Sequence, residues 1–303
     1  MLTWRLMSRA NILPSSESLQ HLYSELYNSD AFIEEHDHIQ CLPAPPDQPS
    51  CKLERVALGL MFWSDSTHLA NFGEAKLWPL YMMFGNLLKY ICSRPNSGAC
   101  QHIPYIPLVN CHYFCYLTPF HDFASCFFTK WSTTKQCEGL LTHCQQELMH
   151  AVWKFLLNDE FLHAYKYGVV IQCHDGVEHR FFPRIFTYSA DYPEKVLIAT
   201  IRDKGKCSCP RCAVTRARTF IYHSGLPING TAVNSLLKDI SSIPTINAFD
   251  NHLRNNFSVS KMLAVDLLHE IELGVWCTLW THLIQMLYAA PRGPKLVAEL
   301  DRR

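Results

Sequence analysis

Two aspartates with matching surroundings are the residues best suited to chemistry in this sequence. Asp65 follows the apolar run Arg55–Trp63, and Asp191 follows the apolar run Arg184–Ala190. Each run has the length and composition of a β-strand, and open α/β sheets place their chemistry at the carboxyl ends of strands. Carboxylates at two neighbouring strand ends could bind the Mg²⁺ or Mn²⁺ ions that catalyse phosphodiester cleavage. A role in a turn or as a helix N-cap is the alternative for each aspartate.

A second group of candidate ligands combines cysteine, aspartate and histidine. Cys209 and Cys212 have the spacing at which two thiolates can bind one zinc ion. Asp266 and His269 are three residues apart and would lie on one face of a helix. Together these four residues could form a structural Zn²⁺ site, which would place Glu270 or Glu272 of the same helix near the strand-end aspartates. A half-buried histidine without a metal is the alternative for His269.

The composition is that of a globular protein without a chain-wide charge. Of the 303 residues, 48% are hydrophobic and 18% are charged, so a sizeable core is expected and global disorder is excluded. The 27 basic and 27 acidic residues balance, which argues against nucleic-acid binding by overall charge. A local basic patch remains, over residues 202–218.

Cysteine usage and apolar segments indicate the compartment. The 14 cysteines are unevenly spaced and no secretory signal is evident, which favours a reducing compartment and a protein that is not secreted. The most apolar segment, Leu273–Ala290, is interrupted by polar side chains. It is therefore predicted to be a buried amphipathic helix and not a membrane span. Five tryptophans in apolar runs are predicted to lie in the core: Trp63, Trp78, Trp153, Trp276 and Trp280.

The elements that must position the candidate residues are predicted from periodicity and turn signals. In chain order they are strands over Arg55–Trp63, Leu77–Phe84 and Ile103–Val109, a helix over Glu138–Tyr167, a hairpin over Val169–Phe182, a strand over Arg184–Ala190, a helix over Pro193–Arg202 and a helix over Lys261–Ala290. Three strands in a meander, a crossover helix and a parallel strand that carries the second acid follow the order of an RNase H-like fold.

Proline content and composition divide the chain into three parts. Residues 1–50 form an N-terminal extension that ends in a Pro-rich linker, Cys41–Ser50. Residues 51–212 form the predicted α/β core, a mixed sheet flanked by helices with a loop-rich insertion over Cys92–Gln136. Residues 213–303 form a helical segment that is expected to be incomplete at Arg303.

Five stretches of the sequence closely resemble the Plavaka-type transposases of fungal mobile elements, which are similar to the CACTA and KDZ groups of cut-and-paste enzymes. These stretches cover residues 22–36 (LYSELYNSDAFIEEH), 53–81 (LERVALGLMFWSDSTHLANFGEAKLWPLY), 148–161 (LMHAVWKFLLNDEF), 182–212 (FPRIFTYSADYPEKVLIATIRDKGKCSCPRC) and 265–284 (VDLLHEIELGVWCTLWTHLI). The resemblance implies an RNase H-like core, divalent-metal transesterification at transposon ends, and action on double-stranded DNA in the nucleus. A homo-oligomer is also expected, and binding to a membrane is not expected.

The resemblance also assigns roles to individual residues. Asp65 matches the first catalytic aspartate and Asp191 the second. Cys209 and Cys212 match a cysteine pair of these groups, and Asp266 with His269 matches an Asp-x-x-His pair.

The chain also departs from the family pattern. Such transposases are usually much longer, and in related groups the third catalytic acid often lies downstream of the Asp-x-x-His pair. Glu272 is the fallback for that acid here. Two interpretations therefore stand: a transposase core, active or inactivated by truncation, and a non-catalytic, zinc-stabilised module that binds DNA or protein. A hydrolase based on Cys or His has no nucleophile–base arrangement to support it.

Overall fold

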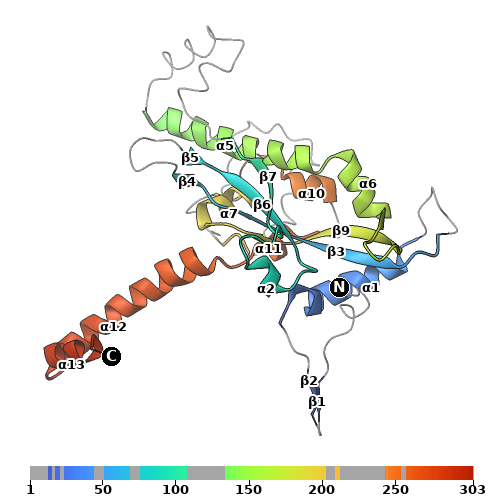
Figure 1. Ribbon diagram of the computed structural model, residues 1–303. Coiled ribbons are helices and arrows are strands. Elements are labelled where there is room, and N and C mark those ends of the chain that lie inside the picture. The colour runs from blue at the N-terminus through green and yellow to red at the C-terminus, as the bar shows by residue number, and fades with distance from the viewer. Residues whose placement is uncertain are drawn as a thin grey trace.

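The computed structural model of the chain describes residues 13–15, 18–20, 24–43, 51–68, 76–107, 134–202, 209–211, 243, 245–253 and 257–302. Its centre is a mixed five-stranded sheet with the strand order β7-β6-β3-β9-β8 (Figure 1). The strands are β3 (Arg55–Ser64), β6 (Pro79–Phe84), β7 (Gln101–Tyr105), β8 (Val169–Gln172) and β9 (Glu178–Ser189). The predicted α/β class, a mixed sheet flanked by helices, is confirmed.

The central pair of strands is parallel, and the other pairs are antiparallel. β3 runs parallel to β9 and antiparallel to β6, while β7 continues the meander from β6 and β8 forms a hairpin with β9. The continuous apolar run of β3 fits its place between two neighbours, because side chains on both of its faces are covered. Two short strand pairs lie outside this sheet: β1 (Leu13–Ser15) with β2 (Ser18–Gln20), and β4 (Thr67–His68) with β5 (Lys76–Leu77).

β9 is longer than predicted. The sequence predicted two strands, one that ends at Phe182 and one that begins at Arg184. Between them is Pro183, and proline cannot donate a ladder hydrogen bond. The structure instead has one strand in which Pro183 lies opposite Leu58 of β3. β8 pairs only with Glu178–Phe181, so no strand adjoins that edge of β9 at Pro183. The missing N–H is tolerated for this reason.

The predicted long helix is two helices, α5 (Thr134–Leu156) and α6 (Asp159–Tyr167). The helical periodicity is correct, but a new helix begins after Asn158, whose side chain accepts a hydrogen bond from Phe161 N at 2.8 Å. The predicted C-cap at Gly168 is confirmed, with φ at +73° and its N–H bonded to Ala164 O. Both helices belong to the crossover between the meander and β9.

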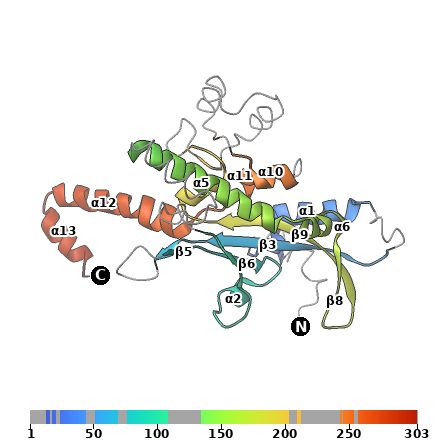
Figure 2. The same ribbon diagram turned by 90° about the horizontal axis from the view of Figure 1, so that it is seen from above.

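Helices cover both faces of the sheet (Figures 1 and 2). The helices α5, α7 (Tyr192–Ile198), α10 (Ala248–Leu253) and α11 (Val259–Met262) contribute to the larger core. Trp153 of α5 is its centre, because its ring contacts those of Phe62, Tyr188 and Phe249. On the opposite face, the 3₁₀ turn η2 (Leu26–Asn28) leads into α1 (Asp30–Cys41). There a smaller cluster joins Phe32 and Ile39 to Ala57 and Phe182. A short helix, α2 (Lys89–Cys92), follows β6.

The C-terminal part differs from the single helix predicted over Lys261–Ala290. After α11, Leu263 forms a parallel bridge with Tyr188 of β9, and a π-helix, η4 (Leu267–Trp276), then begins. α12 (Cys277–Ala289) and α13 (Gly293–Leu300) follow, and α12 projects away from the sheet (Figure 1). The segment is thus interrupted, because Leu263 bridges to β9 and residues 264–266 are not helical.

The tryptophan and membrane predictions have mixed outcomes. Trp78 and Trp153 are buried as predicted, and Trp63 is half-buried. Trp276 and Trp280 stack on each other but are 53% and 43% exposed, so their placement in the core was wrong, as was the burial of the apolar helix. Within the described part of the chain, no helix is long and apolar enough to cross a membrane.

Candidate functional site

The two strand-end aspartates lie at the same edge of the sheet. Trp63 of β3 is the register partner of Ser189 of β9, and two further residues along each parallel strand lead to Asp65 and Asp191. Asp65 is exposed and Asp191 is half-buried. The predicted juxtaposition of the two strand ends is therefore a feature of the fold.

Asp191 also begins a helix. Its Oδ1 accepts a hydrogen bond from Glu194 N at 2.9 Å, which makes it the N-cap of α7. The alternative role predicted for Asp191, that of a helix N-cap, is thus observed. A carboxylate has two oxygens, and capping with one of them leaves the second oxygen's lone pairs for a ligand.

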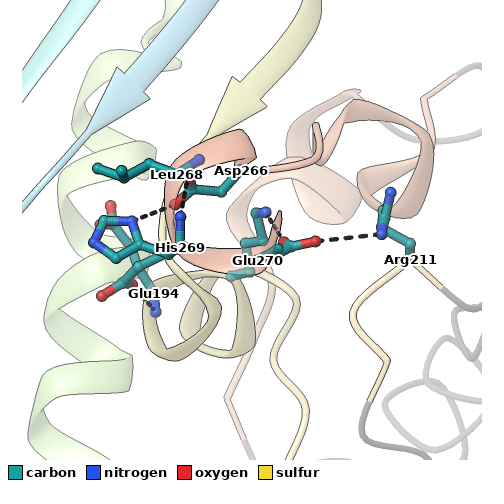
Figure 3. Close-up of polar contacts among 8 residues, drawn as sticks. Glu194, Arg211, Asp266, Leu268, His269 and Glu270 are labelled. Atoms are coloured by element: carbon teal, nitrogen blue, oxygen red, sulfur yellow. Dashed lines mark hydrogen bonds and ion pairs between the residues drawn. The ribbon is translucent and has the colours of Figure 1, made fainter. Parts of the chain in front are cut away.

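The Asp-x-x-His pair reaches the same edge through an extended segment. Ala264 N donates to Tyr188 O of β9 at 2.9 Å, and this bond fixes the chain just before η4. Asp266 then caps η4 by accepting hydrogen bonds from Leu268 N at 3.0 Å and His269 N at 3.2 Å. Its second oxygen lies 2.6 Å from Nδ1 of His269 (Figure 3). Asp266 therefore fixes both the start of η4 and the orientation of the imidazole.

Electrostatics connect this pair to the strand-end acids. The hydrogen bond that His269 donates to Asp266 raises the pKa of His269 above its ordinary value. Partial burial opposes this rise, and the charges of Asp266, Asp191 and Asp65 raise the pKa further. Partial burial raises the pKa of Asp266, but the hydrogen bonds from His269 and Leu268 and the nearby imidazole outweigh it and lower the pKa. The imidazole of His269 therefore lies within the field of all three aspartates.

Glu194 is the residue that sequence reasoning missed. Its side chain is buried, and its Oε1 accepts hydrogen bonds from Ser64 Oγ and from Tyr188 OH, the latter at 2.9 Å. Its Oε2 accepts a hydrogen bond from Trp78 Nε1 at 3.0 Å. The available signal was a Glu three residues after a capping Asp, which suggests a capping box. The structure turns this side chain into the protein interior instead.

Burial gives Glu194 a pH-dependent effect on stability. Burial raises its pKa from 4.5 to about 7, although the hydrogen bonds from Ser64, Trp78 and Tyr188 act to lower it. Since the folded-state pKa is raised, the stabilising contribution is complete below about pH 4.5 and is lost as the pH rises through about 7. A shift of this size corresponds to roughly 3 kcal/mol.

We therefore expect the unfolding free energy of the protein to fall more between pH 5 and pH 8 than that of the Glu194→Gln variant. Urea denaturation of both proteins at the two pH values measures the difference. His269 also titrates in this range, so its pKa is measured by NMR in both proteins and its contribution is subtracted. Parallel pH profiles would contradict a raised pKa at Glu194.

A buried lysine joins α7 to η4. Lys195 has no exposed side-chain surface, and its Nζ pairs with Oε1 of Glu270, which is 26% exposed. Oε2 of Glu270 also lies 3.4 Å from Arg211, in the segment that begins at Cys209 (Figure 3). Of the two glutamates predicted near the strand-end aspartates, Glu270 is therefore the one that the structure ties to the helix capped by Asp191.

The predicted metal ligands are only partly brought together. Among the described residues, no group of three or more His, Cys, Asp or Glu side chains has a geometry ready to hold a metal ion. Cys209 is exposed, and Cys212 lies outside the described residues. Glu272 is exposed on η4, and because π-helical hydrogen bonds span five residues, it need not share the face of His269 as in an α-helix.

The fold and the site define an α/β protein that gathers acidic side chains where two parallel central strands end. A sequence model of the family described as Plavaka transposase matches residues 11–285, which is most of the chain. The chain belongs to the Plavaka transposase family. Searches of curated proteins and of solved structures gave no significant match.

Proposed function

We propose that this chain is the catalytic core of a DNA transposase with an RNase H-like fold, which uses Mg²⁺ or Mn²⁺ to cleave and join phosphodiester bonds at transposon ends. The observation that carries the proposal is the β3–β9 register, because it leads to Asp65 and Asp191 at adjacent ends of two parallel strands. Family membership supports the transposase class. The substrate, double-stranded transposon DNA in the nucleus, belongs to the same proposal.

The strand order supports the RNase H-like part of the proposal. β3, β6 and β7 form an antiparallel meander, and after the α5–α6 crossover the chain returns in β9, parallel to β3. The hairpin strand β8 adds an antiparallel edge before β9. The parallel bridge at Leu263 extends the sheet on that side, next to the segment that leads to Asp266.

The donor set suits a hard divalent cation. Mg²⁺ and Mn²⁺ prefer carboxylate oxygens and water, and Asp65 and Asp191 would hold the ion. Asp266 and the predicted third acid, Glu272, are further candidate ligands. A bound ion of this kind stabilises the attacking and leaving oxygens of a phosphoryl transfer. His269 adds a proton-carrying group, whose Nδ1 is held by Asp266 while Nε2 remains on the other side of the ring.

The test is metal-dependent nicking of DNA that carries the element's ends. The purified chain is expected to nick such DNA with Mg²⁺ or Mn²⁺ and to lose the activity with EDTA. Activity that persists after complete chelation would contradict the proposal. A protein that binds the DNA and the ion but never cleaves would match an inactive form of the core.

One contact favours the second candidate, a zinc-stabilised binding module. The bond between Arg211 and Glu270 brings the Cys209 segment beside η4, which carries Asp266 and His269. Cys209, Cys212, Asp266 and His269 would then hold Zn²⁺, although His269 also lies in the field of the strand-end acids. Metal analysis is expected to find about one zinc per chain, with unfolding by chelators, if this candidate is correct. A zinc-free, stably folded chain would exclude it.

A further inference from the structure

One buried carboxylate of α7 links the ends of three strands of the central sheet beside the candidate site. Glu194 lies in the first turn of α7 and is 3% exposed. It accepts hydrogen bonds from Ser64, the last residue of β3, from Trp78, just before β6, and from Tyr188, near the end of β9. The hydroxyl oxygens of Ser64 and Tyr188 also lie close to each other, at 2.5 Å.

The links through Ser64 and Tyr188, and the backbone of Glu194 itself, each lead to a candidate acid. Ser64 directly precedes Asp65, and the backbone N–H of Glu194 itself holds Asp191. The backbone oxygen of Tyr188 accepts the hydrogen bond from Ala264, two residues before Asp266. A displacement of the Glu194 carboxylate would therefore move the attachment points of all three aspartates.

We propose that Glu194 is a positioning residue, which holds Asp65, Asp191 and the Asp266–His269 pair in one arrangement. Packing alone gives no reason for a carboxylate here, because an apolar side chain of similar volume would avoid the cost of burying a polar group. A carboxylate can instead accept three directed hydrogen bonds at once, and this fixes three strand ends against one helix. A role of Glu194 in catalysis rests on the proposed function, but its role in positioning the three aspartates does not.

The experiment compares two variants of the network with a control. Glu194→Gln replaces one accepting oxygen by a donor, and Ser64→Ala removes one donor without changing any charge. The control is Asn247→Ala, because Asn247 is also buried and bonds to α7, through Ile198 O at 2.8 Å, but at the end of the helix distant from Asp191. Two properties are measured in each folded protein: the His269 pKa by NMR titration, and Mn²⁺ affinity by electron paramagnetic resonance.

Both network variants are expected to lower the His269 pKa in the same direction as Asp65→Asn, because the strand-end acids that raise it are displaced. They should also weaken Mn²⁺ binding by about 10–100-fold, the range seen when groups that orient metal ligands are removed. Asn247→Ala is expected to lower the melting temperature while changing neither property. If Glu194→Gln does not fold, Ser64→Ala decides the question.

An unchanged His269 pKa in the network variants would overturn the positioning role, whatever the activity. An equal shift in Asn247→Ala would also overturn it, because the effect would then reflect general loosening. If the unsubstituted protein binds no Mn²⁺, the metal-dependent function fails, and the His269 pKa still decides the role of Glu194.

Discussion

Replacing Asp191 by asparagine is expected to abolish metal-dependent cleavage while leaving the fold intact. Asparagine caps helices about as well as aspartate, so the bond to Glu194 N at the start of α7 can be kept. The substitution removes the anionic oxygens that a divalent ion requires. Loss of a group that only orients a metal ligand lowers activity by roughly 10–100-fold. Loss of a ligand itself should lower the cleavage rate by more than this.

Asp175→Asn is the matched control for this substitution. Asp175 lies in the turn before β9, at the opposite end of the strand from Asp191, and its Oδ1 accepts a hydrogen bond from Val177 N at 3.1 Å. Asparagine can keep that bond too, so the control removes one charge and preserves the local structure. We expect its cleavage rate and melting temperature to match those of the unsubstituted protein.

Asp65→Asn is expected to have the same effect as Asp191→Asn, because the register leads to both residues at one edge. Asp191→Ala should add a loss of stability of about 1 kcal/mol from the missing cap. Nicking assays and urea denaturation separate these two effects. Cleavage at the normal rate by the Asp65→Asn, Asp191→Asn double variant would exclude both residues from the reaction.

The strand-end position of the two acids could be predicted from the sequence because it depends on local signals. The apolar run Arg55–Trp63 predicts a buried strand, and Asp191 followed by Pro193 predicts the start of a helix. The meander and the parallel return then bring the two strand ends together. The position of the two acids could therefore be inferred from which segments form strands and from their order along the chain.

The rest depended on contacts that have no local pattern. Glu194 belongs to a segment that predicts only a cap, and its partners Ser64 and Trp78 are 130 and 116 residues away in the sequence. The interruption of the last helix at Leu263 arises because an open edge of β9 can pair with it. Periodicity cannot reveal such an edge, so the helix was predicted as continuous and its tryptophans as core.

Glu270→Gln is expected to lower the unfolding free energy by about 3 kcal/mol and to reduce cleavage as well. Lys195 has no exposed surface, so its ammonium group depends on Glu270 for charge compensation. Removing one partner of a buried pair typically costs about 3–5 kcal/mol, and the partial exposure of Glu270 favours the lower end. Because the pair docks η4 onto α7, its loss should also disturb Asp266 and His269.

The pair of Arg184 and Glu35 is the matched control for this prediction. Its side-chain exposures, 6% and 26%, resemble those of Lys195 and Glu270, and its Nε–Oε1 distance is 2.5 Å. It joins α1 to β9 on the opposite face of the sheet, and Arg184 keeps hydrogen bonds to two backbone oxygens when Glu35 is changed. Glu35→Gln should therefore lower stability somewhat less and leave the cleavage rate of the folded protein unchanged.

The double variant Lys195→Met, Glu270→Gln decides how the pair acts. It also removes the ammonium group that Glu270→Gln leaves without a partner. Most of the lost unfolding free energy should therefore return, because no unpaired charge remains buried. Cleavage should not recover with it, because the bond that orients η4 against α7 is still missing. Recovery of both properties would show that the pair serves stability alone, and urea denaturation with nicking assays on the three variants distinguishes these outcomes.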